Sequence, residues 1–169
     1  MADKVLQLGT DGIKEYTPIT TTTGASDAGK LIASGPDGKL AAEFLPDGIG
    51  ADIKVVVASE ALTAGDFVNL WNDSGTIKAR KADASQGFSK PADGYVKANV
   101  ASAANAPVYF DGTNTLTGLT VGSKYYLSAT AGTVTTTIPT TTGHIYQYLG
   151  KAISTTELSV EIQEPILRA

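Results

Sequence analysis

The residues most suggestive of chemistry form a glycine-rich loop that ends in a lysine. Residues 24–31 read Gly-Ala-Ser-Asp-Ala-Gly-Lys-Leu and match G-x-x-x-x-G-K, the start of a loop that cradles nucleotide phosphates. The next position should be Ser or Thr to hold Mg²⁺, but Leu31 has no side-chain oxygen. A strand should precede the loop and a helix should follow it, whereas four threonines precede it and Gly35-Pro36 follows. We therefore interpret residues 24–31 as a turn-rich stretch without a nucleotide site.

Other catalytic arrangements are equally poorly supported. His144 is the single histidine and cysteine is absent, which excludes thiol nucleophiles, disulfides and thiolate metal sites. A Ser–His–Asp triad would need a positioned nucleophile, and no G-x-S-x-G elbow is present. The aspartates occur singly beside or near glycines, which is typical of turns rather than of a calcium loop. We expect no catalytic residue, cofactor or metal; a small hydrolase that uses His144 is an alternative.

Composition narrows the function classes further. The chain has 169 residues, a net charge of −4 and a pI near 4.9, so it lacks the basic balance expected of a nucleic-acid-binding protein. No stretch approaches the roughly 20 apolar residues of a membrane span, and no apolar signal core follows Met1. Charged residues make up 18% while threonine occurs 22 times. This low charge suggests that part of the surface is covered by something other than water.

The elements that must position any site are strands. Leu158, Val160 and Ile162 alternate with polar residues, which predicts a strand with one buried face. Several short strands separated by turns predict a small all-β barrel or sandwich over residues 55–169. The expected strands are residues 53–58, 64–71, 76–81, 94–100, 107–110, 124–128, 133–138, 144–152 and 157–162.

Residues 1–54 differ from the rest of the chain. They contain two of the twelve aromatic residues, Tyr16 and Phe44, and turn-forming residues occur throughout. The scattered apolar residues are too few to close a core and too many for a solvated tail. We therefore expect an extended N-terminal arm that becomes ordered against a partner. A short hairpin around residues 35–38, or one helical turn at 41–44, is expected within it.

Tyrosines gather in the last third of the chain. Tyr125 and Tyr126 are adjacent, and Tyr146 and Tyr148 share one face of a predicted strand. Tyrosine suits interfaces that have one wet edge, so we assign Tyr125, Tyr146 and Tyr148 to an oligomer interface. Packing in the core and an aromatic platform for carbohydrate or another partner are the alternatives.

Two groups of segments resemble bacteriophage proteins. Residues 26–33 (SDAGKLIA), 37–40 (DGKL), 44–46 (FLP) and 48–50 (GIG) are similar to the N-terminal segment of tailed-bacteriophage virion proteins. The second group resembles the β domain of phage head decoration (cement) proteins and related fibre-base proteins. It comprises residues 58–71 (ASEALTAGDFVNLW), 109–114 (YFDGTN) and 119–128 (LTVGSKYYLS).

The resemblance implies a non-enzymatic virion structural protein that is made in the host bacterial cytoplasm and lies on the capsid surface. Such a protein would bind the major capsid protein as a homotrimer and stabilise the shell against internal pressure, without contacting nucleic acid or a membrane. An alternative is a fibre or fibre-base protein that presents a host-binding β domain. The natural capsid anchors are the apolar side chains of the arm: Leu31, Ile32, Leu40, Phe44, Leu45 and Ile49.

Overall fold

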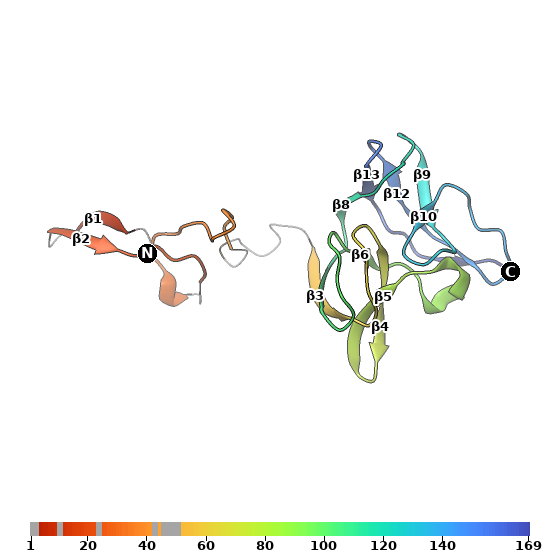
Figure 1. Cartoon of the computed structure of the whole chain (residues 1–169), viewed down its shortest axis with the longest axis horizontal. Coiled ribbons are helices and arrows are strands. Elements are labelled where there is room, and N and C mark those ends of the chain that lie inside the picture. The colour runs from red at the N-terminus through yellow and green to blue at the C-terminus, as the bar shows by residue number, and fades with distance from the viewer. Residues whose placement is uncertain (1–3, 10–11, 23–24, 42–43, 45–51) are drawn as a thin grey trace. The chain divides into compact units, whose positions relative to one another are not determined.

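A computed structural model of the chain describes residues 4–9, 12–22, 25–41, 44 and 52–169. The chain forms two units, Met1–Gly50 and Ala51–Ala169. Strands dominate both units, and the named helical segments are the short 3-10 turns η1 (Ala25–Asp27) and η3 (Ala84–Ser89) (Figure 1). The predicted all-β class is confirmed.

The first unit begins with a two-stranded hairpin. β1 (Val5–Gly9) pairs antiparallel with β2 (Gly12–Tyr16), and Gly9 lies opposite Gly12 at the turn. Gly12 has φ of +107°, a backbone conformation that glycine adopts without a steric penalty. Sequence patterns did not predict these strands, because five-residue strands beside a short turn give little periodicity to recognise.

A turn follows where the sequence places one, but its flanks differ from the expected hairpin. The Gly38 N–H donates to the Gly35 carbonyl at 2.9 Å, and the Gly35 N–H donates to the Lys39 carbonyl at 2.7 Å. Ile32 instead forms a parallel bridge with Ile19, on the other side of η1. Among the described residues, Ile32 therefore pairs with an earlier segment and not with the segment that follows the turn.

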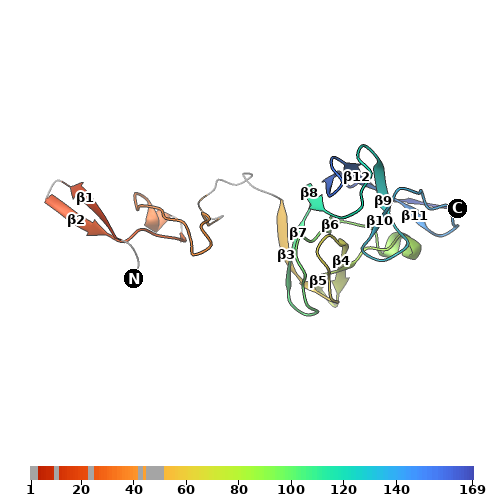
Figure 2. The same cartoon turned by 45° about the horizontal axis from the view of Figure 1, so that its top comes forward.

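The second unit contains a closed five-stranded barrel, which resolves the choice between barrel and sandwich. The barrel order is β3-β5-β4-β6-β7, and β3 runs parallel to β5 while the other pairs are antiparallel. These strands lie together in Figure 2. Their bounds are β3 (Ile53–Ala58), β4 (Phe67–Asp73), β5 (Thr76–Lys81), β6 (Gly94–Tyr95) and β7 (Asn105–Tyr109).

A second sheet packs against the outside of the barrel. Its order is β10-β9-β12-β13-β8, and a separate two-stranded sheet joins β11 to β14. The hairpin expected over residues 124–138 and the one expected over 144–162 are both present, although the first strand of the latter is broken at Gln147. The bounds are β8 (Gly112–Thr115), β9 (Lys124–Leu127), β10 (Val134–Thr135), β11 (Ile145–Tyr146), β12 (Tyr148–Ala152), β13 (Glu157–Val160) and β14 (Ile166–Leu167).

Strand alternation gives this unit two cores. In β4, Phe67 belongs to the core under the second sheet, and the next residue, Val68, belongs to the barrel interior. Tyr95 and Val96 divide between the same two cores. Successive side chains of a strand point to opposite faces, so a wall buried on both faces contributes to both cores. The unit therefore buries its own apolar residues.

Candidate interaction surfaces

The candidate chemical motifs take the following local structures in the described part of the chain. Ala25–Asp27 forms the 3-10 turn η1 rather than a phosphate-binding loop, and Lys30 Nζ lies 2.5 Å from Asp27 Oδ1. The half-buried His144 receives a backbone hydrogen bond from Arg168, whose N–H lies 2.8 Å from the His144 carbonyl. In the part of the chain that the structure describes, His, Asp and Glu do not gather in threes that could hold a metal ion. No described helix is long and apolar enough to cross a bilayer.

The predicted arm anchors lie in a unit whose described residues form no buried core. Leu31, Ile32 and Leu40 are exposed, and Phe44 is half-buried. The Phe44 N–H donates to the Ala41 carbonyl at 3.1 Å, and the two middle residues of the predicted helical turn at residues 41–44 lie outside the described residues. None of the described side chains of this unit is buried, so apolar contacts remain available to another molecule. The remaining anchors, Leu45 and Ile49, lie outside the described residues.

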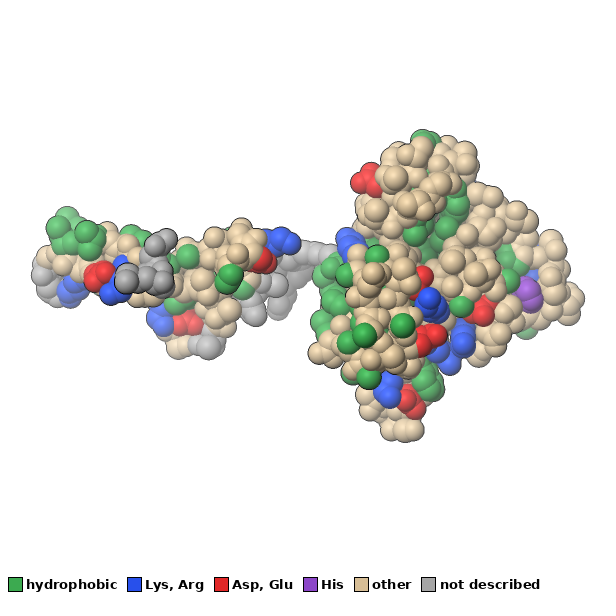
Figure 3. Space-filling model, viewed as in Figure 1, with side chains coloured by type: hydrophobic (Ala, Val, Ile, Leu, Met, Phe, Trp, Pro, Cys, Tyr) green, Lys and Arg blue, Asp and Glu red, His purple; other side chains and the backbone are tan. Residues whose placement is uncertain are grey.

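The β1–β2 hairpin carries a further apolar surface, which sequence reasoning did not assign. Leu6, Leu8 and Ile13 share one face of the hairpin, because Leu8 pairs with Ile13 and Leu6 lies two residues along β1. They are 71%, 78% and 70% exposed, and hydrophobic atoms gather over this hairpin in Figure 3. An isolated two-stranded hairpin has only marginal stability in water, so we expect this apolar face to pack against a partner. Its signal in the sequence was Leu-x-Leu before an Asp-Gly turn.

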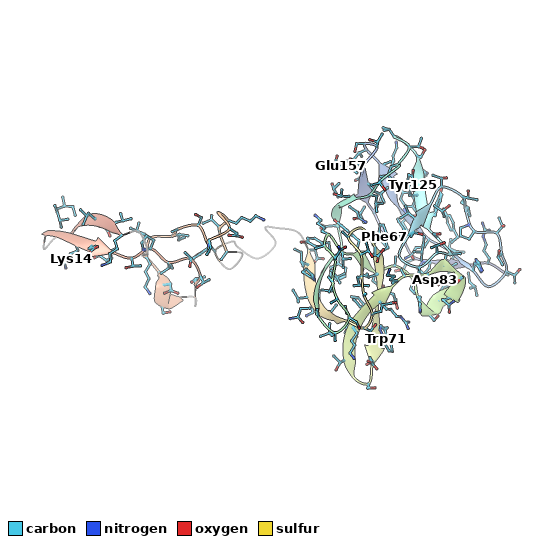
Figure 4. All side chains as sticks on the ribbon, in the orientation of Figure 1. Lys14, Phe67, Trp71, Asp83, Tyr125 and Glu157 are labelled. Atoms are coloured by element: carbon cyan, nitrogen blue, oxygen red, sulfur yellow. The ribbon has the colours of Figure 1, made fainter. Side chains whose placement is uncertain are left out.

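The predicted interface tyrosines separate into two environments. Tyr125 is 6% exposed and belongs to the core under the second sheet, where its hydroxyl accepts a 2.9 Å hydrogen bond from the Thr120 N–H. Figure 4 shows Tyr125 and Phe67 within their unit, whereas Glu157 lies at its periphery. Tyr125 thus offers little surface to a neighbouring subunit. Strand alternation could have indicated this, because Tyr125 shares its face with the apolar Leu127.

Tyr146 and Tyr148 instead lie together, and Tyr126 joins them. The Tyr126 ring centroid lies 5.1 Å from that of Tyr146 and 5.9 Å from that of Tyr148, the latter pair edge to face. Tyr126 lies beneath the other two, which are half-buried. Burial raises the pKa of Tyr126 and that of Tyr148 above the ordinary value, so these two hydroxyls stay neutral at physiological pH.

Cationic and aliphatic side chains border these tyrosines. Lys124 Nζ lies 5.9 Å from the Tyr148 ring centroid, and the Arg168 guanidinium lies 5.9 Å from that of Tyr146. The exposed Ile166 pairs with Tyr146 across β11 and β14. Partly exposed aromatics with arginine and an aliphatic neighbour are typical of the energetic centre of a protein interface. We call the set Lys124, Tyr126, Tyr146, Tyr148, Ile166 and Arg168 the tyrosine surface.

Comparison with known proteins does not place the chain in a family. No protein-family model matches the sequence. No curated protein matches it either.

Proposed function

We propose that this chain is a non-enzymatic structural protein of a bacteriophage virion that binds the outside of the capsid as an oligomer and stabilises the shell. The observation that carries the proposal is the contrast between the two units. The second unit buries two cores of its own, while the described part of the first buries no side chain and exposes apolar ones. A segment of this kind gains its contacts from another surface.

The two units would have different roles. The arm would contact the major capsid protein through Leu31, Ile32, Leu40, Phe44, Leu45 and Ile49. The second unit would carry the tyrosine surface, through which copies meet as a homotrimer. Linking several arms in one oligomer makes each further contact effectively intramolecular, so weak arms together give strong binding to a repetitive shell. Such binding would oppose the outward pressure of packaged DNA without contact with the DNA.

A capsid-binding assay tests the proposal. We would compare the full chain with a version that lacks residues 1–50, using purified capsids that lack the protein and measuring co-sedimentation. The second unit has its own cores, so the shortened chain should stay folded and lose capsid binding. Undiminished binding by the shortened chain would reject the role of the arm.

Leu40→Glu provides a finer test, because it places a charge at an exposed anchor of the arm. Ile77→Glu is the matched control, since Ile77 is similarly exposed on β5 of the other unit. We expect the first substitution alone to weaken binding to capsids. If neither the full chain nor the chain without residues 1–50 binds capsids, but the full chain binds host cells or glycans, the fibre or fibre-base alternative is favoured.

A further inference from the structure

The first half of β3 has an open edge. The Asp52 carbonyl accepts from the Phe110 N–H at 3.0 Å, and the Ala58 N–H donates to the Ala104 carbonyl at 2.9 Å. The even-numbered residues of this strand therefore direct their backbone hydrogen bonds towards β7. By alternation, the N–H and carbonyl groups of Ile53 and Val55 point away from β7. β5 joins β3 only at Val57 and Ala58. These groups of Ile53 and Val55 therefore have no strand partner among the described residues.

The same two residues expose apolar side chains at this edge. Ile53 is 43% exposed and Val55 is 55% exposed, and hydrophobic atoms gather on this flank of the barrel in Figure 3. Native proteins usually protect such edges with charges, prolines or bulges, because an open apolar edge is a template for another strand. A strand that pairs with this edge should therefore have an apolar side chain at every second residue, and those same residues should have unpaired backbone N–H and carbonyl groups.

β1 has these two properties. Gly9 lies opposite Gly12 at the turn and forms the hydrogen-bonded pair that closes the β1–β2 hairpin. Since hydrogen-bonded pairs recur at every second residue, Gln7 and Val5 also bond to β2. Leu6 and Leu8 consequently direct their backbone groups away from β2, to the free side of the hairpin. The residues with free backbone groups are thus also those with exposed apolar side chains, in β1 as in β3.

We infer that the β1–β2 hairpin of one copy adds to the open edge of β3 in a second copy, which extends the sheet between molecules. An antiparallel arrangement places Leu6 opposite Val55 and Leu8 opposite Ile53. Residues opposite each other across an antiparallel pair lie on the same face, so all four apolar side chains pack together. The main chain supplies the hydrogen bonds, as in other cases of strand addition.

Charge favours this occupant over a second copy of β3. Antiparallel pairing of β3 with itself through Ile53 and Val55 would set Lys54 opposite Lys54, and directly opposed like charges are destabilising. In the inferred pairing, the neutral Gln7 lies opposite Lys54. Lys54 and Lys97 make no ion pair with any described residue, and residues 1–50 carry four lysines against seven acidic residues. The acidic arm thus complements Lys54 at the open edge.

The inference goes beyond the capsid role and does not depend on it, because its test uses the purified protein alone. The chain has no cysteine, so engineered thiols report single positions. We would mix isotopically labelled Gln7→Cys protein with unlabelled Lys54→Cys protein, oxidise it gently, and measure disulfide-linked species by mass spectrometry. Both are full-length, and each has one thiol, so a mixed species can form only between copies.

Gln7 and Lys54 would form a non-hydrogen-bonded pair, whose close Cα atoms suit a disulfide. The control replaces Lys54→Cys with Lys151→Cys, at an exposed position on β12. We expect the Gln7–Lys54 combination to give about tenfold more mixed dimer than this control, because pairing raises the local thiol concentration. A yield no higher than the control overturns the inference. Predominance of either homodimer also overturns it, because that species reports pairing of like strands.

A second variant tests the mode of pairing. Val55→Pro removes an N–H that faces the open edge and leaves the bonds to β7 intact, so the barrel should keep its melting temperature. Combined with Lys54→Cys, it should lower the mixed-dimer yield about tenfold, the effect of losing one buried hydrogen bond. Val55→Thr keeps both the N–H and the β-branched shape and should preserve most of the yield. An unchanged yield with proline would reject strand addition.

Discussion

The buried side-chain amide of Gln147 pairs with the backbone of Ala92 as a neighbouring strand would. Its Oε1 accepts from the Ala92 N–H at 2.8 Å, and its Nε2 donates to the Ala92 carbonyl at 2.8 Å. Nε2 also donates to the Gln163 carbonyl at 3.0 Å. Gln147 is 1% exposed and lies at the break between β11 and β12, whereas Ala92 lies just before the barrel strand β6. This one side chain thus ties the second sheet to the barrel.

Gln147→Leu should destabilise the second unit markedly. Leucine has a similar size but leaves the N–H and carbonyl of Ala92 buried without these partners, which costs about 3 kcal/mol of unfolding free energy. Urea unfolding followed by tryptophan fluorescence measures the change. Gln163→Leu is the control, because its exposed side chain can change while its carbonyl still accepts from Gln147. Equal stability of the two variants would contradict the role of the Gln147 amide.

This contact also shows where sequence reasoning ends. A continuous apolar run with β-branched residues predicted the barrel strand at residues 53–58 with the observed bounds, because such a run is a local property of the sequence. Residues 144–152 looked like one strand, yet the chain breaks at Gln147 so that its amide can reach Ala92. The partner lies 55 residues away in the sequence, so no local pattern could reveal the break.

Asp93 should make stability depend on pH. Burial raises the pKa of this carboxyl, opposed by hydrogen bonds from the Leu70 N–H and Asn69 Nδ2 and assisted by the charge of Glu164. The folded state therefore holds this proton to a higher pH than the unfolded chain does. The contribution of Asp93 to stability is thus largest below its ordinary pKa of 3.8 and is lost as pH rises through the raised folded value.

Asp93→Asn should remove this dependence while keeping the local geometry. A single Asp93 oxygen accepts both hydrogen bonds, at 2.6 Å from Leu70 and 3.0 Å from Asn69, and an amide oxygen can replace it. Relative to the native chain, the variant should gain about 2–4 °C in melting temperature between about pH 4 and about pH 7. Glu157→Gln, at an exposed position on β13, is the control. A gain equal to that of the control would contradict the burial of charge at Asp93.

Gly150 should be intolerant of any side chain. The register of β12 against β9 shifts between Tyr148 and Gly150, and a Cβ at Gly150 would collide with the Ser159 carbonyl oxygen on β13. Gly150→Ala should therefore cost about 3 kcal/mol or more in unfolding free energy, because backbone must move on a central strand. Gly118→Ala is the control: φ there is +71° and no atom lies within 4 Å of the added Cβ, so about 1 kcal/mol is expected. If urea unfolding showed similar losses of unfolding free energy for Gly150→Ala and Gly118→Ala, β12 would have shifted to make room for the added Cβ, which contradicts the prediction.

The candidate interface was only partly predictable. The two-residue spacing of Tyr146 and Tyr148 placed them on one face of the chain, and the structure brings them together on Tyr126. Tyr125 was assigned to the same interface because adjacent tyrosines look alike in sequence. In β9 they occupy opposite faces, and Tyr125 shares its face with the apolar Leu127, so alternation within the strand indicates which of the two meets this core.

Tyr146→Glu should prevent self-association of the second unit if the tyrosine surface is the oligomer interface. The substitution removes an aromatic anchor and places a charge at the centre of the surface, and losing one such anchor costs about 2 kcal/mol or more of association free energy. In a chain that lacks residues 1–50, so that arms cannot join copies, we expect the mass measured by light scattering to fall from that of the oligomer to that of the monomer at matched concentrations.

The control must separate association from folding. Tyr146 is half-buried, so the melting temperature of a diluted, monomeric sample should show that the fold is retained. Ile77→Glu adds the same charge on β5, outside the tyrosine surface, and should leave the mass unchanged. An unchanged mass for Tyr146→Glu would move the oligomer interface elsewhere. Association that disappears only when residues 1–50 are removed would instead assign it to the arm.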